Sequence, residues 1–185
     1  MKYAIITGAS SGFGAAIAKE LQELGYGLVL LARRIDRLEE LQKKLSQTPV
    51  YIAQLDVCQE EQVKNVISNL PREIADNCFI LVNNAGLAVG RGPLDTGLSE
   101  DWNRMLDTNV KGLLYMSHAV IPLLKKHPYS HLINISSIAG KEVYAGGNVY
   151  CASKHAVDAL SKALRIDLLP PQIKVSNIAP GAADT

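Results

Sequence analysis

The most constraining feature of this sequence is the regular alternation of short apolar runs with longer segments in which apolar residues recur at helical spacing. An uninterrupted apolar run, such as GLVLLA at residues 27–32, is typical of a strand that is buried on both faces. Strands are therefore predicted at residues 2–7, 27–32, 50–55, 79–83, 131–136 and 173–178. Helices are predicted at residues 12–24, 35–45, 60–70, 109–126 and 148–169, with Ser99 as the candidate cap of an additional helix and Pro122 as a candidate bend.

Strands that alternate with helices in this way predict one α/β domain over residues 1–185, built on a doubly wound, Rossmann-like parallel sheet. The near balance of 19 Lys+Arg against 18 Asp+Glu gives no argument for nucleic acid or a membrane as a partner. No apolar run approaches the ~18 residues of a membrane span, and the N-terminus lacks the features of a secretory signal. The cysteines and histidines show no metal-ligand spacing, so we expect no metal site and a cytoplasmic location.

The first predicted strand runs through the glycine-rich sequence TGASSGFG, at residues 7–14, into a helix. Glycines at such a turn let the main chain approach a pyrophosphate, and the helix N-terminus offers free N–H groups to the phosphates. The spacing G-x-x-x-G-x-G differs from the common G-x-G-x-x-G fingerprint, so the turn taken alone is also compatible with an ordinary βα connection.

Arg33 and Arg34 follow the second strand, where an NAD site usually places a carboxylate for the ribose 2′-hydroxyl. Guanidinium groups match a 2′-phosphate in charge and geometry. The pair therefore favours NADP(H) as the cofactor, and the alternative is two solvated residues at the start of a helix.

Tyr150 and Lys154 lie one turn apart on the last predicted helix, so their side chains project from the same face. The ordinary pKa of a tyrosine, about 10, makes it a poor base at neutral pH, and a nearby ammonium group favours the phenolate. Tyr150 is therefore a candidate general acid and base, the alternative being an amphipathic surface pair. Ser137 follows the fifth strand, where it is either a ligand for a substrate oxygen or a turn serine.

Asn109 lies within a predicted helix, where an amide is mildly unfavourable, and this indicates a buried hydrogen bond. The sequence Asn-Asn-Ala-Gly at residues 83–86 and the pair Pro180-Gly181 follow the fourth and sixth strands. Carboxyl ends of parallel strands share one edge of a sheet, so these segments are expected near the same crevice.

In order and context these motifs resemble those of the short-chain dehydrogenases/reductases. The matching positions are Thr7-Gly-x-x-x-Gly-x-Gly14, Asp56, Asn83-Asn-Ala-Gly86, Asn109, Ser137, Tyr150-x-x-x-Lys154 and Pro180-Gly181. The resemblance covers essentially the whole chain. It implies an oxidoreductase that moves a hydride between NADP(H) and a small alcohol or ketone.

The resemblance also implies a role for each matched position. Asn109, Ser137, Tyr150 and Lys154 would form a catalytic tetrad, in which Tyr150 transfers the proton and Lys154 also holds the nicotinamide ribose. Ser137 would orient the substrate oxygen, and the main chain at Asn109 would hold a water of the proton relay. The remaining implied cofactor contacts are Gly8, Ser10, Gly12, Phe13 and Gly14 at the pyrophosphate, Asp56, Val57, Asn83, Ala85 and Gly86 around the adenosine, and Pro180, Gly181 and Thr185 at the nicotinamide.

More narrowly, residues 51–57, 83–88 and 144–150 are similar to the NADP-dependent 3-hydroxy acid dehydrogenases, also described as serine or L-allo-threonine dehydrogenases. Relatives continue beyond the Pro-Gly motif with a substrate loop and a seventh strand, whereas this sequence stops at Thr185. One alternative is therefore a catalytically impaired NADP-binding or scaffold protein. Another is a sugar-nucleotide epimerase, against which the glycine spacing and the Asn-Asn-Ala-Gly motif argue.

Relatives pair through the helices that correspond to residues 109–126 and 148–169, so the resemblance implies a homodimer or homotetramer. Arg91, in the loop after Gly86, is a candidate for binding a substrate carboxylate, although a solvated loop arginine is the commoner role.

Overall fold

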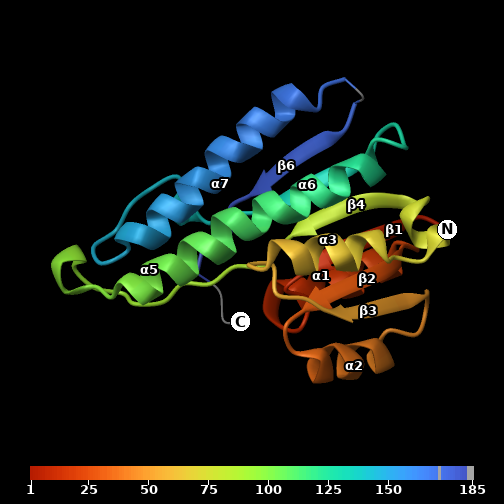
Figure 1. Cartoon of the computed structure of the whole chain (residues 1–185), viewed down its shortest axis with the longest axis horizontal. Coiled ribbons are helices and arrows are strands. Elements are labelled where there is room, and N and C mark those ends of the chain that lie inside the picture. Colours follow the sequence, from red (N-terminus) through yellow and green to blue (C-terminus); the bar gives the residue numbers. More distant parts are fainter. Residues whose placement is uncertain (171, 183–185) are drawn as a thin grey trace.

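The computed structural model describes residues 1–170 and 172–182. Within them one sheet holds six strands in the order β3-β2-β1-β4-β5-β6, and every neighbouring pair is parallel (Figure 1). The strands are β1 (Tyr3–Thr7), β2 (Gly27–Ala32), β3 (Val50–Gln54), β4 (Cys78–Asn83), β5 (His131–Ile135) and β6 (Lys174–Ile178). The strand order reverses between β1 and β4, which is where such sheets open a crevice for ligands. The predicted doubly wound, Rossmann-like fold is confirmed.

Helices cover both faces of this sheet (Figure 1). On one face α1 (Gly12–Glu23) and α2 (Ile35–Lys44) pack against β1, β2 and β3. On the other face lie α3 (Glu60–Ser68), α6 (Leu113–Leu124) and α7 (Asn148–Asp167), with α6 against β4 and α7 against β6. No helix among the described residues combines the length and the apolar character needed to cross a bilayer.

The two faces draw alternate residues from the same apolar strands. Ile5 and Leu31 belong to the core beneath α3 and α6, whereas their neighbours Ile6 and Leu30 belong to the core beneath α1 and α2. Every residue of β1 and β2 is buried. A strand buried on both faces favours apolar residues throughout, which is why the sequence shows continuous apolar runs there; Thr7, at the end of β1, is buried with its hydroxyl group hydrogen-bonded.

The longest helical rod differs from its prediction. α5 (Ser99–Leu106) continues through a π-helical segment (Asp107–Gly112) into α6, so the predicted helix at residues 109–126 is the second part of a longer element (Figure 1). The prediction that Ser99 caps a helix is wrong, because Ser99 is the first residue of α5 and the extended residue Leu98 precedes it. A short helix, α4 (Arg72–Ala75), follows Pro71 and was not predicted.

Candidate active site

The glycine turn after β1 is fastened to the segment after β4. The hydroxyl oxygen of Thr7 accepts hydrogen bonds from the main-chain N–H groups of Asn84 and Ala85, each at 3.0 Å. The amide Nδ2 of Asn84 donates back to the carbonyl oxygens of Thr7 (2.9 Å) and Gly8 (3.2 Å). Gly8 has φ +64°, and a Cβ at Gly14 would lie 2.5 Å from the Gly8 carbonyl oxygen. Glycine at both positions therefore lets the turn and α1 close against each other.

A cleft of about 260 Å³ opens over this turn. Its walls come from the turn after β1, the ends of β2 and β3, the segment after β4 and the π-helical segment. The lining residues are Gly8, Ser10, Ser11, Gly12, Phe13, Ala32, Arg33, Arg34, Leu55, Asp56, Val57, Asn84, Ala85, Gly86, Leu87 and Thr108. Most of the cofactor contacts predicted at the pyrophosphate and the adenosine thus share one cavity.

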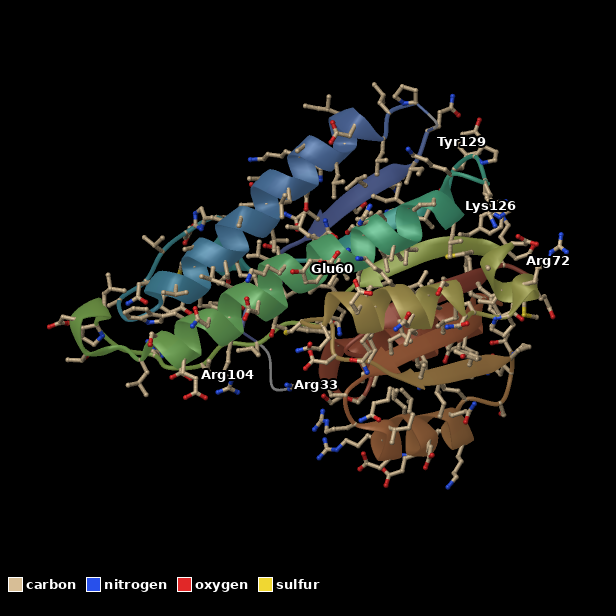
Figure 2. The ribbon with its side chains drawn as sticks, viewed as in Figure 1. Arg33, Glu60, Arg72, Arg104, Lys126 and Tyr129 are labelled. Atoms are coloured by element: carbon tan, nitrogen blue, oxygen red, sulfur yellow. The ribbon has the colours of Figure 1, made fainter. Side chains whose placement is uncertain are left out.

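Arg33 and Arg34 lie at the mouth of this cleft, and both are exposed. Figure 2 shows Arg33 beyond the arrowhead of β2. Arg34 Nη2 donates to the hydroxyl oxygens of Ser10 and Ser11, at 3.0 Å each. Neither arginine has an acidic partner within the described part of the chain. The cleft mouth therefore carries two guanidinium groups that form no ion pair among the described residues, and Asp56 is the acidic residue in the cleft lining.

Some predicted cofactor contacts do not line the cleft. Asn83 is buried in the sheet, where its Nδ2 donates to the Ser117 hydroxyl and to Asn134 Oδ1, at 2.9 Å each. Its neighbour Asn84 takes the place in the cleft wall. The contact predicted at Thr185 falls outside the described residues.

Asn109 lies in the π-helical segment and is buried. Its Nδ2 donates to the Leu87 carbonyl oxygen (2.9 Å) and to the Ser153 hydroxyl (3.0 Å), and its Oδ1 accepts from the Leu87 N–H (2.8 Å). This confirms the predicted buried hydrogen bond, and it joins the loop after β4 to α7. A π-helical turn inside a longer helix is frequent at functional sites.

Lys154 is 6% exposed, and its ammonium group donates to the Ile135 carbonyl oxygen at 3.0 Å. Its Nζ lies 5.9 Å from the centre of the Tyr150 ring. A Cβ at Gly86 would lie 3.4 Å from that Nζ and 3.2 Å from Asn109 Oδ1, so these side chains meet beside the cleft. Burial lowers the pKa of Lys154 to about 8, because the charged form loses its hydration.

Ser137 begins a short 3₁₀ turn (Ile138–Gly140) after β5, and its hydroxyl oxygen accepts from the Ala139 N–H at 3.1 Å. The first N–H of this turn donates to the Pro180 carbonyl oxygen at 3.0 Å. At the last residue of the turn, a Cβ would lie 2.7 Å from the Lys154 carbonyl oxygen. The Ser137 turn is therefore packed between α7 and the segment after β6.

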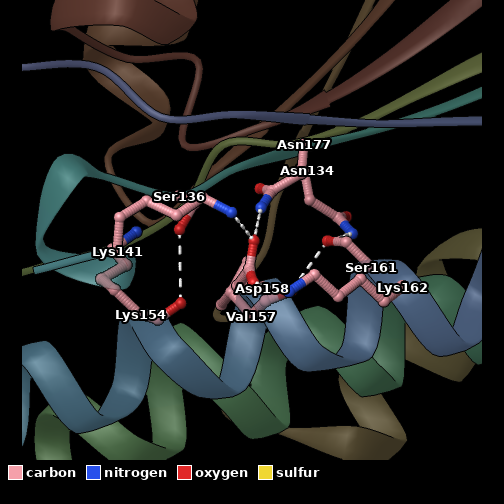
Figure 3. Close-up of polar contacts among 9 residues, drawn as sticks. All are labelled: Asn134, Ser136, Lys141, Lys154, Val157, Asp158, Ser161, Lys162 and Asn177. Atoms are coloured by element: carbon pink, nitrogen blue, oxygen red, sulfur yellow. Dashed lines mark hydrogen bonds and ion pairs between the residues drawn. The ribbon is translucent and has the colours of Figure 1, made fainter.

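An ion-pair cluster lies next to the 3₁₀ turn that follows Ser137 (Figure 3). Asp158 on α7 is 8% exposed and accepts from Lys141, Lys162 (2.7 Å) and Asn177 (3.0 Å). Lys141 directly follows the turn that Ser137 begins. Lys141 first, and then Lys162, hold the pKa of Asp158 far below its usual range.

A second cavity of about 280 Å³ lies on the side of Tyr150. Its lining residues are Ala88, Val89, Gly90, Arg91, Met105, Tyr144, Gly146, Gly147, Asn148 and Tyr150. The sequence interpretation missed Leu87, Thr108 and Asn148, which carry no local signal. It also missed Ser11 and Asn84, although both lie within motifs that it had singled out.

The chain is similar to proteins of known activity. A family model described as short chain dehydrogenase matches residues 2–185. The NADP-dependent 3-hydroxy acid dehydrogenase YdfG of Escherichia coli (strain K12) is 44% identical over 177 residues, which are 96% of this chain and 71% of that protein. Sulfoacetaldehyde reductase 2 of Chromohalobacter salexigens is 43% identical over 183 residues, which are 98% of this chain and 72% of that protein.

A solved structure of a related dehydrogenase is also similar to this chain. The closed form of serine dehydrogenase complexed with NADP⁺ matches with a TM-score of 0.92 at 43% sequence identity, covering 97% of this chain and 71% of that one. The shared architecture therefore extends over nearly the whole of this chain.

Proposed function

The chain belongs to the short-chain dehydrogenase family, and on that premise we propose that it transfers a hydride between NADP(H) and a small alcohol or ketone. One observation carries the proposal. The cavity that Tyr150 lines adjoins the cleft at Leu87 and Ala88, and the cleft mouth holds two guanidinium groups that form no ion pair among the described residues. Lys154 lies between Gly86 of the cleft wall and the Tyr150 ring. The protein is then an NADP-dependent dehydrogenase that acts on CH–OH groups.

The cleft fits a phosphorylated dinucleotide. Ser11 precedes α1 but makes no side-chain capping bond, so the first N–H groups of the helix stay available to a pyrophosphate. The positive φ of Gly8 and Gly12 leaves the main chain accessible to a ligand. Arg33 and Arg34 supply the cations that a ribose 2′-phosphate requires.

We assign the proton transfer to side chains that follow β4 in the chain. When bound, the dinucleotide supplies the hydride chemistry. During alcohol oxidation Tyr150 accepts the hydroxyl proton, and during ketone reduction it returns that proton. Ser137 holds the substrate oxygen by a hydrogen bond, and the ammonium group of Lys154 favours the phenolate form of Tyr150. The main chain of the π-helical segment at Asn109 holds the water that carries the proton to solvent.

We assign the substrate to the small hydroxy acids, with serine and allo-threonine as examples. Two relatives are named for 3-hydroxy acids and for sulfoacetaldehyde, and both names denote a small molecule with an anionic group. A cavity of about 280 Å³ is just below the ~300–1,000 Å³ range of ligand pockets, which suits a substrate of a few carbon atoms.

The test follows NADPH absorbance while the protein is incubated with a panel of ketones and hydroxy acids. Tyr150→Phe is expected to keep NADPH binding and to lose turnover at least ~100-fold, the usual scale for a general acid–base. Near-normal turnover of this variant would remove Tyr150 from the mechanism. NADPH binding by the wild type without turnover of any compound would favour the scaffold alternative instead.

Self-association and location belong to the same proposal. A homodimer or homotetramer would form through α5, α6 and α7, on which Leu106, Leu114 and Ile166 expose apolar side chains. Light scattering of the purified protein measures the number of subunits. A cytoplasmic location fits the free thiols of the three cysteines.

A further inference from the structure

The cavity beside Tyr150 has one charged residue in its wall. Apolar side chains, glycines and the polar residues Tyr144, Asn148 and Tyr150 make up the rest of the lining, and the charge belongs to Arg91. Within the described residues Arg91 makes no ion pair. The cavity wall therefore contains both the guanidinium group of Arg91, which has no ion-pair partner among the described residues, and the phenol of Tyr150, the proposed proton donor.

The main chain around Arg91 is fastened to the start of the helix that carries Tyr150. The N–H of Gly92 donates to the Gly146 carbonyl oxygen at 3.1 Å. Asn148 Nδ2 donates to the Gly92 carbonyl oxygen at 3.0 Å. Because Asn148 is the first residue of α7 and Tyr150 the third, these bonds hold the loop that carries Arg91 beside the start of the helix that carries Tyr150.

The side chain of Arg91 is also supported. Its guanidinium carbon lies 5.6 Å from the centre of the Tyr144 ring, within cation–π range. Tyr144 lines the same cavity, so this contact directs the guanidinium along the cavity wall. A planar aromatic support leaves the N–H edges of the guanidinium available to a ligand.

Two glycines in the left-handed region allow these loops to meet. Gly90 has φ +62°, and a Cβ there would lie 2.5 Å from Asp101 Oδ2. Gly146 has φ +76°, and a Cβ there would lie 3.2 Å from the Gly92 nitrogen. Asp101 pairs with Arg104 at 3.4 Å, so this nearby carboxylate is already engaged.

We propose that Arg91 binds the anionic group of the substrate, a carboxylate or a sulfonate, while Tyr150 meets the alcohol or carbonyl oxygen of the same molecule. The inference rests on the proposed function and deepens it, since it names the residue that selects acids over neutral alcohols. A guanidinium binds the oxygens of either anion through two parallel hydrogen bonds. Two attachment points, one at each end of a short substrate, fix which carbon faces the hydride path.

The experiment compares three alcohols of similar size: 3-hydroxypropionate, 2-hydroxyethanesulfonate and the neutral 1,3-propanediol. In Arg91→Met the KM for the anion that the site accepts is expected to rise ~10- to 100-fold, the scale of a lost charge-assisted pair. The KM for 1,3-propanediol is expected to stay within about twofold, and kcat within about threefold, because the group acts on binding. A rise for 3-hydroxypropionate alone identifies a carboxylate site, and a rise for the sulfonate alone identifies a sulfonate site.

The matched control is Arg72→Met. Arg72 is also an exposed arginine, and Figure 2 shows it with Lys126 at the end of the molecule away from Arg104. It is not among the residues that line the cavity beside Tyr150. This variant removes the same charge and is expected to leave all three KM values unchanged. If Arg91→Met changes the three KM values equally, or changes none of them, Arg91 does not select anions and the proposal is overturned.

A binding measurement separates this inference from the proposed function. The two anions are titrated into the protein–NADPH complex, and their binding is followed through the fluorescence of NADPH. Binding that is at least ~10-fold weaker in Arg91→Met supports the anion site even if the wild type turns over no member of the panel. Equal binding by the two proteins, or no binding by either, overturns it.

Discussion

The two halves of the molecule bury polar groups very differently. Among the described residues before Asn83, the buried polar side chains are those of Thr7 and Gln22. From Asn83 onward they are those of Asn83, Asn109, Ser117, Ser130, Asn134, Ser136, Ser153, Lys154, Asp158 and Ser161. The first half is an apolar support that presents main chain and exposed arginines to a ligand. In the second half, the proposed catalytic side chains are surrounded by buried polar residues that hydrogen-bond to one another.

This difference predicts where substitutions act. A surface cation changes ligand affinity and hardly changes stability, because it is hydrated with or without the ligand. A buried polar group changes stability and its pH dependence, because it has lost water and depends on its partners. Substitutions of the exposed arginines at the cleft mouth are therefore expected to change ligand affinity. Substitutions of the buried polar residues from Asn83 onward are expected to change the free energy of unfolding.

The largest effect is expected at the cleft mouth. Arg33→Asp should weaken NADPH binding about 1,000-fold, because charge-assisted bonds to the 2′-phosphate are replaced by repulsion, together roughly 4 kcal/mol. NADH binding and thermal stability should change little. Fluorescence titration measures both affinities, and Arg37→Asp, an exposed residue of α2 outside the cleft wall, serves as the matched control. Equal losses for NADPH and NADH would contradict the assignment of Arg33.

The next effect concerns Lys154. Its pKa is about 8 in the folded protein and 10.5 when unperturbed, so between these pH values the unfolded chain holds a proton that the folded one has released. The free energy of unfolding should therefore rise with pH across this window, by up to roughly 3 kcal/mol. Urea unfolding between pH 7 and pH 10 measures the rise. The rise in the free energy of unfolding should vanish in Lys154→Met and persist in Lys19→Met, whose side chain is exposed. If the rise survives in Lys154→Met, it does not come from Lys154.

The smallest effect is expected at Asp158. Its lowered pKa means that its contribution to stability is present above the ordinary carboxyl pKa of about 4 and is lost as the pH falls below it. Asp158→Asn should lower the free energy of unfolding by about 1 kcal/mol at pH 7, since both lysine partners are half exposed to screening solvent. Asp76→Asn, which breaks a more exposed pair, should cost less. If the two variants lose equal stability, burial does not distinguish the two ion-pair clusters.

The secondary structure was largely predictable. Each predicted strand end lies within one residue of its observed position, because continuous apolar runs bounded by polar residues leave little choice. The π-helical segment was not predictable, because a one-residue expansion of a turn shifts the apolar spacing by a single position, which is within the ordinary variation of a helical pattern. The Ser99 prediction failed because a residue that can cap a helix can equally begin one.

The site was predictable where a motif constrains the main chain. Gly8 and Arg33 lie in the cleft wall as their positions in the sequence indicated. Asn83 and Asn84 show the limit of such arguments, since adjacent residues of a strand end point to opposite sides. The motif located the pair, and only the sheet decided that Asn84 lines the cleft while Asn83 is buried against Ser117.

By itself the sequence determined the parallel sheet, the glycine turn and the positive charge after β2, because these depend on local periodicity, main-chain freedom and the identity of one or two residues. The tertiary structure alone decided which side chains meet. Asn109 joins Leu87 to α7, Lys141 reaches Asp158, and the Arg91 loop is fastened to the start of the helix that carries Tyr150. Contacts between residues far apart in the chain depend on how the layers pack, and no local pattern records that packing.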